Sequence, residues 1–336
     1  MAVKIIEGDC RERLQEIEAD TVHCCVSSPP YFGLRDYGID GQIGLEQTPE
    51  EFISGLVGVF SEVRRVLRED GTLWLNLGDS YWTAKGASCG VDPKQKARRG
   101  FARPQDRPAP MGIKGKDLIG IPWMAAFALR ADGWFLRSHI VWHKPNPMPE
   151  SVADRPTSAH ESLFLLAKSS RYYYDADAIR EAESVPDWDD GSRVFGGANK
   201  HGANVKHGAR TTGRVAEKRK RGVPPRHSQY ESSDQSGLDK VPRGAGRNKR
   251  NVWTVATRPF AEAHFATFPP GLIEPCILAG CPKGGTVLDP FGGAGTTGLV
   301  ADRLGRDALL IELNPEYAAM ARRRISGDAP LLADVS

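Results

Sequence analysis

Residues 286–297 read Thr286-Val287-Leu288-Asp289-Pro290-Phe291-Gly292-Gly293-Ala294-Gly295-Thr296-Thr297. This stretch predicts an apolar strand with an acid at its tip, followed by a glycine loop that opens a helix. Glycines at such a position let the backbone approach a ligand closely, because no Cβ stands in the way. The next apolar strand ends in Glu312, 23 residues after Asp289 (312 − 289), where an acid can accept the hydroxyls of a ribose. We expect a site for an adenosine-containing cofactor; the alternative is a tight turn beside a surface Glu.

Strands and helices alternate through most of the chain, which predicts an α/β fold with a mostly parallel sheet and helices on both faces. The expected strands are Val3–Glu7, Thr21–Ser27, Thr72–Leu77, Trp134–Trp142, Ser162–Lys168, Thr286–Leu288 and Ala308–Ile311. The expected helices run from the capping box Thr48–Glu51 to Asp70-Gly71, over Asp117–Arg130, Pro270–Ala279 and Thr296–Leu304, and from Asn314 to Ile325. Residues 83–112, rich in Gly, Pro and basic residues, predict a long mobile loop.

Two motifs give the chain a resemblance to a known family. Ser28-Pro29-Pro30-Tyr31 follows a predicted strand, and Asp289–Thr296 resembles the motif D-P-F-x-G-x-G-T of S-adenosylmethionine-dependent amino-methyltransferases. Because the Pro-Pro motif comes first and the glycine loop last, the order resembles the beta group of DNA amino-methyltransferases. This implies a Rossmann-like methyltransferase fold that is circularly permuted, in which Val3–Glu7 supplies the strand missing after the last helix. The resemblance covers residues 3–82, 118–175 and 251–325.

The same resemblance implies S-adenosyl-L-methionine as the cofactor, together with the residues that hold it. The residues implied beside its methionine and adenosine are Asp289, Phe291, Gly293, Gly295 and Thr296, with Glu312 on the ribose and Asp9 facing the adenine. The segment Thr267-Phe268-Pro269-Pro270 resembles the one that helps to hold the methionine moiety. No metal is implied.

The Pro-Pro motif suits chemistry on the exocyclic amine of a base, whose lone pair is delocalised into the ring. Two acceptors aimed at the amine hydrogens, Ser28 Oγ and the Pro29 carbonyl, would free that lone pair for in-line methyl transfer. Pro29 and Pro30 remove backbone donors and stiffen the loop, while Tyr31 can stack on the base. A base inside a duplex cannot reach such a pocket, so it must flip out. A Pro-Pro turn with a purely structural role is the alternative.

The identity of the methylated base depends on Ser28. Family members with Ser or Thr at this position mostly methylate cytosine N4, whereas most adenine-N6 enzymes carry Asp or Asn. Ser28 therefore favours cytosine N4, and adenine N6 stays open. Asp79 ends a neighbouring strand, where it is expected either to line the same cleft and contact DNA or to serve as a helix cap or turn acid.

Two further segments could take part in the chemistry. His143, Lys144 and Asn146 lie in a proline-laced loop, which suits the wall of a flipped-base pocket or a phosphate contact. Pro275-Cys276 matches the dipeptide whose thiolate attacks the ring in cytosine-C5 methyltransferases. It lies within an apolar helical stretch, however, with nothing but the helix start to lower its pKa, so we expect Cys276 in the core.

Charge is unevenly distributed along the chain. The net charge is only +3, yet residues 191–250 carry 15 Lys and Arg against 4 Asp and Glu, a local +11. A basic stretch with few apolar residues is an expected contact for a phosphate backbone. The candidate DNA-contacting residues are Arg219, Lys220, Arg221, Arg247, Lys249 and Arg250. A solvated loop without function is the alternative.

Bulk composition is that of a globular protein, with 40% hydrophobic and 26% charged residues. No apolar run approaches the ~20 residues of a membrane helix, and the first residues have no signal-peptide core, so we expect a cytoplasmic location. The six cysteines form no C-x-x-C pair and are expected to be mostly buried free thiols.

These observations predict a site-specific methyltransferase acting on duplex DNA, as a monomer or homodimer, with a cognate restriction endonuclease as a candidate partner. The expected divisions are a catalytic half (1–175), a basic target-recognition insert (176–250), a cofactor half (251–327) and a tail (328–336). RNA or protein-glutamine methyltransferases and a DNA-binding protein with a degenerate cofactor fold are the rivals. Because Asp289, Gly293, Gly295 and Glu312 are intact, the degenerate fold is disfavoured.

Overall fold

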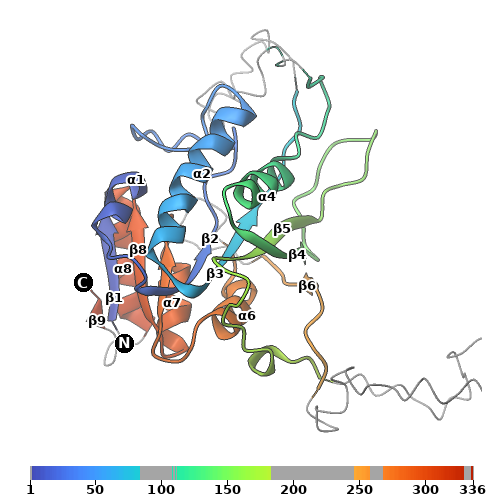
Figure 1. Cartoon of the computed structure of the whole chain (residues 1–336). Helices are drawn as coiled ribbons and strands as arrows, with labels where there is room; N and C mark the ends of the chain where they lie inside the picture. Colours follow the sequence, from blue (N-terminus) through green and yellow to red (C-terminus); the bar gives the residue numbers. More distant parts are fainter. Residues whose placement is uncertain are drawn as a thin grey trace, which may run out of the picture. The chain divides into compact units, whose positions relative to one another are not determined.

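A nine-stranded sheet forms the centre of the fold, in the order β6-β4-β5-β3-β2-β7-β8-β1-β9 (Figure 1). The computed structural model describes residues 2–83, 108, 110, 112–182, 246–257, 268–328 and 334–335. The strands are β1 (Ala2–Glu7), β2 (Val22–Ser27), β3 (Leu67–Leu77), β4 (Phe135–His143), β5 (His160–Ala167), β6 (Val252–Thr254), β7 (Thr286–Asp289), β8 (Asp307–Glu312) and β9 (Asp334–Val335). Only β5 is antiparallel to its neighbours, β3 and β4. The predicted α/β fold with a mostly parallel sheet is confirmed.

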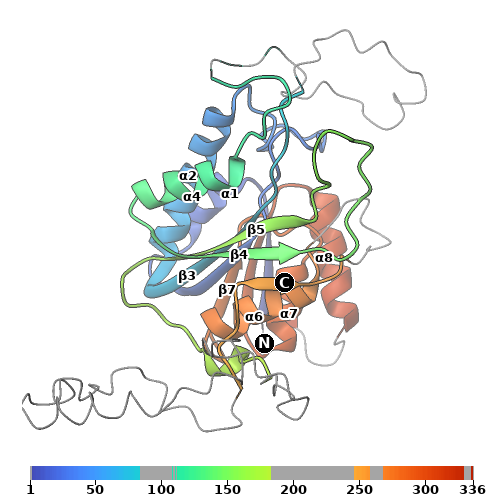
Figure 2. The ribbon, with the colours of Figure 1, turned by 90° about the vertical axis from the view of Figure 1, so that its right-hand side faces the viewer.

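Helices cover both faces of the sheet (Figure 2). They are α1 (Cys10–Arg13), α2 (Pro49–Val66), α4 (Ile121–Ala131), α6 (Pro270–Gly280), α7 (Thr296–Arg303) and α8 (Pro315–Asp328). One hydrophobic core lies under α1, α2 and α4, and a second lies under α6, α7 and α8. The predicted capping box is present at α2, where the Glu51 N–H donates to Thr48 Oγ1 at 3.2 Å and the Thr48 N–H to Glu51 Oε2 at 3.3 Å.

The two ends of the sequence meet within the sheet. β1 lies parallel to β8, with Val3 opposite Ala308 and Glu7 opposite Glu312. The strand missing after the last helix is thus supplied by the beginning of the chain, as the permuted order predicted. At the middle of the sheet β2 lies parallel to β7, so the strand before the Pro-Pro motif is adjacent to the strand before the glycine loop.

The largest differences from the predicted boundaries occur at two places. α2 ends at Val66, and β3 already begins at Leu67, because Leu67 is extended and pairs with Val22 of β2. Strand pairing therefore ends the helix before the turn that the sequence predicts at Asp70-Gly71. α4 begins only at Ile121, since Gly120 before it adopts a left-handed conformation with φ +87°, which is incompatible with an earlier helical turn.

By its internal contacts the chain divides into a large unit of residues 1–179 and 249–336 and a small unit of residues 180–248. In the described part of the small unit, the backbones of Glu181 and Arg247 exchange two hydrogen bonds of 2.9 Å. Most of the predicted loop at 83–112 and most of the basic segment lie outside the described residues. Within the described ranges, every helix is too short or too polar to cross a lipid bilayer.

Candidate functional site

The two sequence motifs meet at the carboxyl ends of β2 and β7. Ser28–Tyr31 leaves β2, and the glycine loop leaves the adjacent strand β7. Ser27 Oγ donates a 2.7 Å hydrogen bond to Asp289 Oδ1, and both side chains are buried. In open α/β sheets, ligands bind outside the carboxyl ends of the strands. This edge of the sheet is therefore the candidate active site.

The carboxylate of Asp289 is engaged within the protein. Besides Ser27, the Thr297 hydroxyl donates to Oδ2 at 2.7 Å and the Phe291 N–H to Oδ1 at 3.1 Å. Burial raises the pKa of Asp289 to about 6, opposed by the hydrogen bonds from Thr297 and Ser27. Asp289 thus anchors the start of the glycine loop through its carboxylate, and its contribution to cofactor binding remains a prediction.

The backbone conformation of the glycine loop leaves free space beside Gly293. The Gly293 N–H donates to Glu312 Oε2 at 2.7 Å, while Glu312 Oε1 accepts from the Asn314 N–H at 2.8 Å. Gly293 and Gly295 have φ of +49° and +75°, which L-residues rarely adopt. A Cβ on Gly295 would lie 2.8 Å from the Cβ of Ala321, whereas one on Gly293 would meet only a carbonyl oxygen at 3.9 Å. The loop can therefore admit a ligand over Gly293.

The other predicted cofactor residues lie within the loop, at the start of α7 and just before α6. Thr296 is buried at the first position of α7, with its Oγ1 accepting from an arginine of α8 at 2.9 Å. The ring of Phe291 packs against a phenylalanine of α2. Phe268 is partly buried against the core and Pro269 precedes the first residue of α6. Thr267 lies outside the described residues.

Asp9 lies at the tip of β1, where the preceding Gly8 N–H donates to the Glu312 carbonyl at 2.9 Å. Asp9 and Glu312 therefore end adjacent strands, as the cofactor prediction requires. The Asp9 side chain also caps α1, accepting from the Arg11 N–H at 2.8 Å, and it forms an ion pair with the Arg11 guanidinium. Arg11 lowers the pKa of Asp9, so Asp9 is both a structural cap and a candidate contact.

The Pro-Pro motif is linked to a cluster of polar side chains. The Tyr31 hydroxyl donates to Glu161 Oε2 at 2.5 Å, and Asn76 Nδ2 donates to Tyr31 Oη at 2.7 Å and to Glu161 Oε2 at 2.9 Å. Ser28 Oγ lies 3.4 Å from Tyr31 Oη. The Tyr31 ring lies against Gly78, where an added Cβ would come within 2.5 Å of a ring carbon. Burial, together with Glu161, raises the pKa of Tyr31 well above its usual value.

Sequence reasoning missed Asn76 and Glu161. Asn76 is only 3% exposed near the end of β3, and Glu161 lies at the start of β5 beside Lys144, with which it forms an ion pair. The available signal was polarity in an apolar context: Asn76 stands between two leucines, and Glu161 comes shortly before the apolar run 163–167. That signal marks a polar group in the core but does not say what it contacts.

Several predicted DNA-contacting residues have partners within the protein. Asp79 accepts from the Gly120 and Ile121 N–H groups at 3.0 and 3.2 Å, so of its two expected roles the structure shows the helix cap. The His143 ring lies 3.2 Å from a threonine hydroxyl of β6. The Asn146 amide nitrogen donates to the carbonyl of residue 257, and the Asn146 amide oxygen accepts from the N–H of the same residue. His143 and Asn146 thus fasten the end of β4 to the chain that follows β6.

Three of the six basic residues that are candidates for DNA contact lie within the described part of the chain. Arg247 forms an ion pair with Glu181 at 3.1 Å, and the ammonium of Lys249 lies 5.0 Å from the ring centre of Trp253. The Arg250 carbonyl accepts from the Trp253 indole at 2.6 Å. Their contact with DNA remains a prediction. Arg219, Lys220 and Arg221 lie outside the described residues.

Cys276 is a core residue, as predicted. It is fully buried in α6, its thiol faces the Leu272 carbonyl at 3.4 Å, and burial raises its pKa well above the usual value. A protonated, inaccessible thiol is a poor nucleophile. The structure therefore speaks against attack by Cys276 on a cytosine ring.

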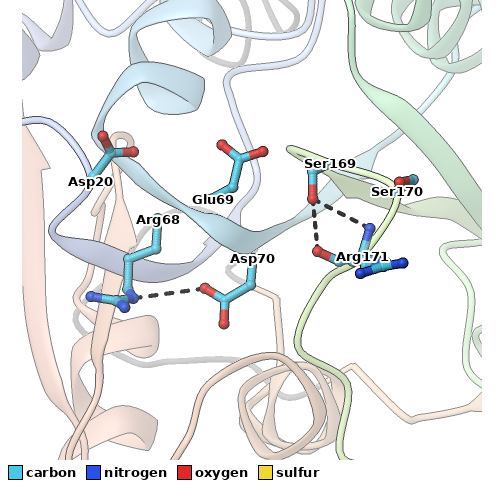
Figure 3. Close-up of a pocket in the computed structure, with 7 residues that line it drawn as sticks. All are labelled: Asp20, Arg68, Glu69, Asp70, Ser169, Ser170 and Arg171. Atoms are coloured by element: carbon cyan, nitrogen blue, oxygen red, sulfur yellow. Dashed lines mark hydrogen bonds and ion pairs between the residues drawn. The ribbon is translucent and has the colours of Figure 1, made fainter.

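A surface hollow lies at the opposite edge of the sheet (Figure 3). It is lined by Asp20, Arg68, Glu69, Asp70, Ser169, Ser170 and Arg171. These residues surround the amino end of β3 and the loop after β5. Since both motifs lie at the carboxyl ends of the parallel strands, this hollow is separate from the candidate active site.

Comparison with protein families identifies the class. The model of the DNA methylase family, which covers N6 and N4 methyltransferases, matches residues 22–323. The match spans most of the sequence, so the chain belongs to this family and is a DNA methyltransferase of exocyclic amines. The resemblance inferred from the two motifs is confirmed.

Individual relatives match over almost the whole chain. Type II methyltransferase M.Cfr9I of Citrobacter freundii is 45% identical over 324 residues, which is 96% of this chain and 88% of the relative. Type II methyltransferase M.SmaI of Serratia marcescens is 43% identical, covering 96% of this chain and 90% of the relative.

Solved structures share the fold. A DNA modification methylase of Thermus thermophilus, complexed with S-adenosyl-L-methionine, aligns with a TM-score of 0.56 at 22% identity over 99% of both chains. The cytosine-N4-specific PvuII DNA methyltransferase aligns with a TM-score of 0.56 at 17% identity, over 95% of this chain and 86% of that one. At these identities the likeness concerns the fold alone.

Proposed function

We propose that the protein transfers the methyl group of S-adenosyl-L-methionine to N4 of a cytosine flipped out of duplex DNA. The observation that carries this proposal is the position of Ser28, which leaves β2 beside the glycine loop of β7. Ser28 is a neutral hydroxyl where an acidic or amide side chain is typical of adenine-N6 enzymes. The DNA methylase family match supports the reaction class.

The glycine loop fits the adenosyl cofactor. The space over Gly293 lacks a protein side chain within 3.9 Å of a built Cβ, so backbone and ligand can come close. Each carboxylate oxygen of Glu312 accepts one backbone N–H and retains a lone pair for a ribose hydroxyl. When bound, the cofactor supplies a methyl group on a positively charged sulfur.

The catalytic motif prepares the amine. Ser28 Oγ and the Pro29 carbonyl would accept the two amine hydrogens, which directs the N4 lone pair toward the methyl carbon. Methyl transfer would form one C–N bond and break one C–S bond, and the nitrogen would then release one proton to solvent. Tyr31 would stack on the extruded base. No covalent link between enzyme and base is needed, in keeping with the buried Cys276.

DNA binding is assigned to the basic insert. The segment 176–250 would hold phosphates and read base edges, and its excess of positive charge supports this assignment. Like its Type II relatives, the protein would methylate a defined site. A cognate endonuclease and the oligomeric state stay predictions.

Nucleoside mass spectrometry of mixed-sequence duplex DNA, incubated with the protein and S-adenosyl-L-methionine, tests the proposal. N4-methylcytosine is the expected product. N6-methyladenine would retain the family and the amine chemistry but would show that Ser28 does not select the base. Absence of both products in the presence of measured cofactor binding would contradict the proposal.

A further inference from the structure

The hydrogen-bond network behind the Pro-Pro motif has a defined direction. A carboxylate can only accept hydrogen bonds, so the Tyr31 hydroxyl directs its proton to Glu161 Oε2, 2.5 Å away. Tyr31 Oη in turn accepts from Asn76 Nδ2 at 2.7 Å. The raised pKa of Tyr31 keeps this proton on the phenol. Donors therefore point toward Glu161 throughout the cluster.

This direction determines what Ser28 can do. A serine hydroxyl has one proton and two lone pairs. Because the Tyr31 proton is committed to Glu161, the 3.4 Å contact between Ser28 Oγ and Tyr31 Oη is made with the Ser28 proton. Asn76 Nδ2, at 3.5 Å from Ser28 Oγ, makes shorter contacts with Tyr31 and Glu161. Ser28 is left with a lone pair for a hydrogen of the base amine.

The carboxylate at the end of this network is itself held in place. Glu161 Oε1 forms an ion pair with Lys144, whereas Oε2 receives Tyr31 and Asn76. The Glu161 and Lys144 side chains are 14% and 19% exposed, so water screens them less than a surface pair. Both oxygens of Glu161 therefore have assigned partners, and rotation of the carboxyl group is restrained.

The geometry points to Glu161 as the positioning residue that makes Ser28 a hydrogen-bond acceptor for the base amine. The inference rests on the proposed function, because it concerns how the same site treats the amine. Glu161 acts through Tyr31 and Ser28 and need not touch the base. An amide at this position could donate to Tyr31 Oη and turn the Tyr31 proton toward Ser28 Oγ. That contact would occupy one of the two Ser28 lone pairs and free the Ser28 proton to point at the base amine, where an acceptor is needed.

The test is a double-mutant cycle in the full-length protein with Glu161→Gln and Tyr31→Phe. We expect Glu161→Gln to lower kcat by about 10- to 100-fold and to leave KM for DNA and cofactor within about threefold. Tyr31→Phe already breaks the chain of hydrogen bonds from Ser28 to Glu161. Adding Glu161→Gln to that variant should therefore lower kcat little further. Glu62→Gln, which removes a carboxylate from the Glu62–Arg65 ion pair on α2, is the matched control and should be neutral.

An independent readout is the Tyr31 hydroxyl proton in NMR spectra. A phenol donating to a carboxylate over a short distance should give a downfield, slowly exchanging signal that is lost in Tyr31→Phe and lost or shifted upfield in Glu161→Gln. The inference would be overturned if the kcat losses of the two single variants multiplied in the double variant. It would also be overturned if Glu161→Gln retained full kcat. If the wild type methylates no base, the proposed function fails. The Tyr31 hydroxyl signal then tests the hydrogen-bond network by itself, and its absence would overturn that network.

Discussion

The glycine loop and the Pro-Pro loop leave neighbouring strands at the same edge of the sheet, but they are supported differently. The glycine loop donates backbone hydrogen bonds to Asp289 and Glu312, which lie at the tip of its own strand and of the next one. Tyr31 of the Pro-Pro loop is held by Asn76 and Glu161, 45 and 130 residues away in sequence. One loop is supported locally, while the other depends on distant strands.

Removing the proposed acceptor should have the largest effect and should act on the Pro-Pro loop alone. Ser28→Ala is expected to lower kcat by about 100- to 1,000-fold, as loss of one hydrogen-bonding group in a reacting site does. Cofactor binding, measured by calorimetry, should be unchanged because the glycine loop is supported independently. Ser54→Ala, at an exposed position of α2, is the control. Full turnover in Ser28→Ala would remove Ser28 from the chemistry.

The glycine loop can be broken from its own side. Gly295→Ala forces a Cβ onto a residue with φ +75° and to within 2.8 Å of the Ala321 Cβ. We expect a loss of about 2–5 kcal/mol in unfolding free energy and weakened cofactor binding. Gly58→Ala, in α2 with open space around the built Cβ, should be neutral or stabilising by about 0.5–1 kcal/mol. Equal denaturation midpoints for the two variants would contradict this account.

Asp289 links the two loops and should make their junction sensitive to pH. Its pKa lies at about 6 in the fold against 3.8 normally, so its favourable contribution is present below pH ~4 and is lost as pH rises through ~6. The difference corresponds to about 3 kcal/mol at most. We expect Asp289→Asn to gain stability relative to wild type between pH ~4 and ~7, measured by urea unfolding. A pH-independent difference would refute the raised pKa.

Cys276→Ala should have the smallest effect and should spare both loops. The thiol is buried in α6, where it faces the Leu272 carbonyl. A loss of about 1 kcal/mol in stability is expected from the missing packing, with methylation rates unchanged. Abolished methyl transfer in a folded variant that still binds cofactor would instead assign Cys276 to the chemistry.

The contrast between the loops also explains what could be predicted from the sequence. Alternating periodicity and the order of the two motifs were sufficient for the fold class and for the pairing of β1 with β8. The glycine loop could be recognised from the sequence because the two acids that support it each stand at the end of an apolar strand. Glu161 was not, since nothing in the residues around position 161 indicates that Tyr31 lies beside it.

Boundary errors have the same origin. Leu67 continues the apolar stripe of α2, and only its pairing with Val22 in the sheet makes it extended. The sequence allowed Asp79 to line the site or to cap a helix; the cap became evident only from its hydrogen bonds with the distant Gly120 and Ile121 backbone, and a contact with DNA stays a prediction. Contacts across the chain, rather than local propensity, resolve such choices.

The pairing of β1 with β8 has a consequence for how the protein is made. Val3 pairs with Ala308, 305 residues later (308 − 3), and the other partner of β1 in the described sheet, β9, is later still. At a synthesis rate of roughly 5–20 residues per second, β1 waits on the order of 15–60 s for a neighbour. The pairing that brings the tip of β1 beside the tip of β8 therefore forms only after β8 has been synthesised, so a shorter nascent chain lacks this part of the candidate cofactor site.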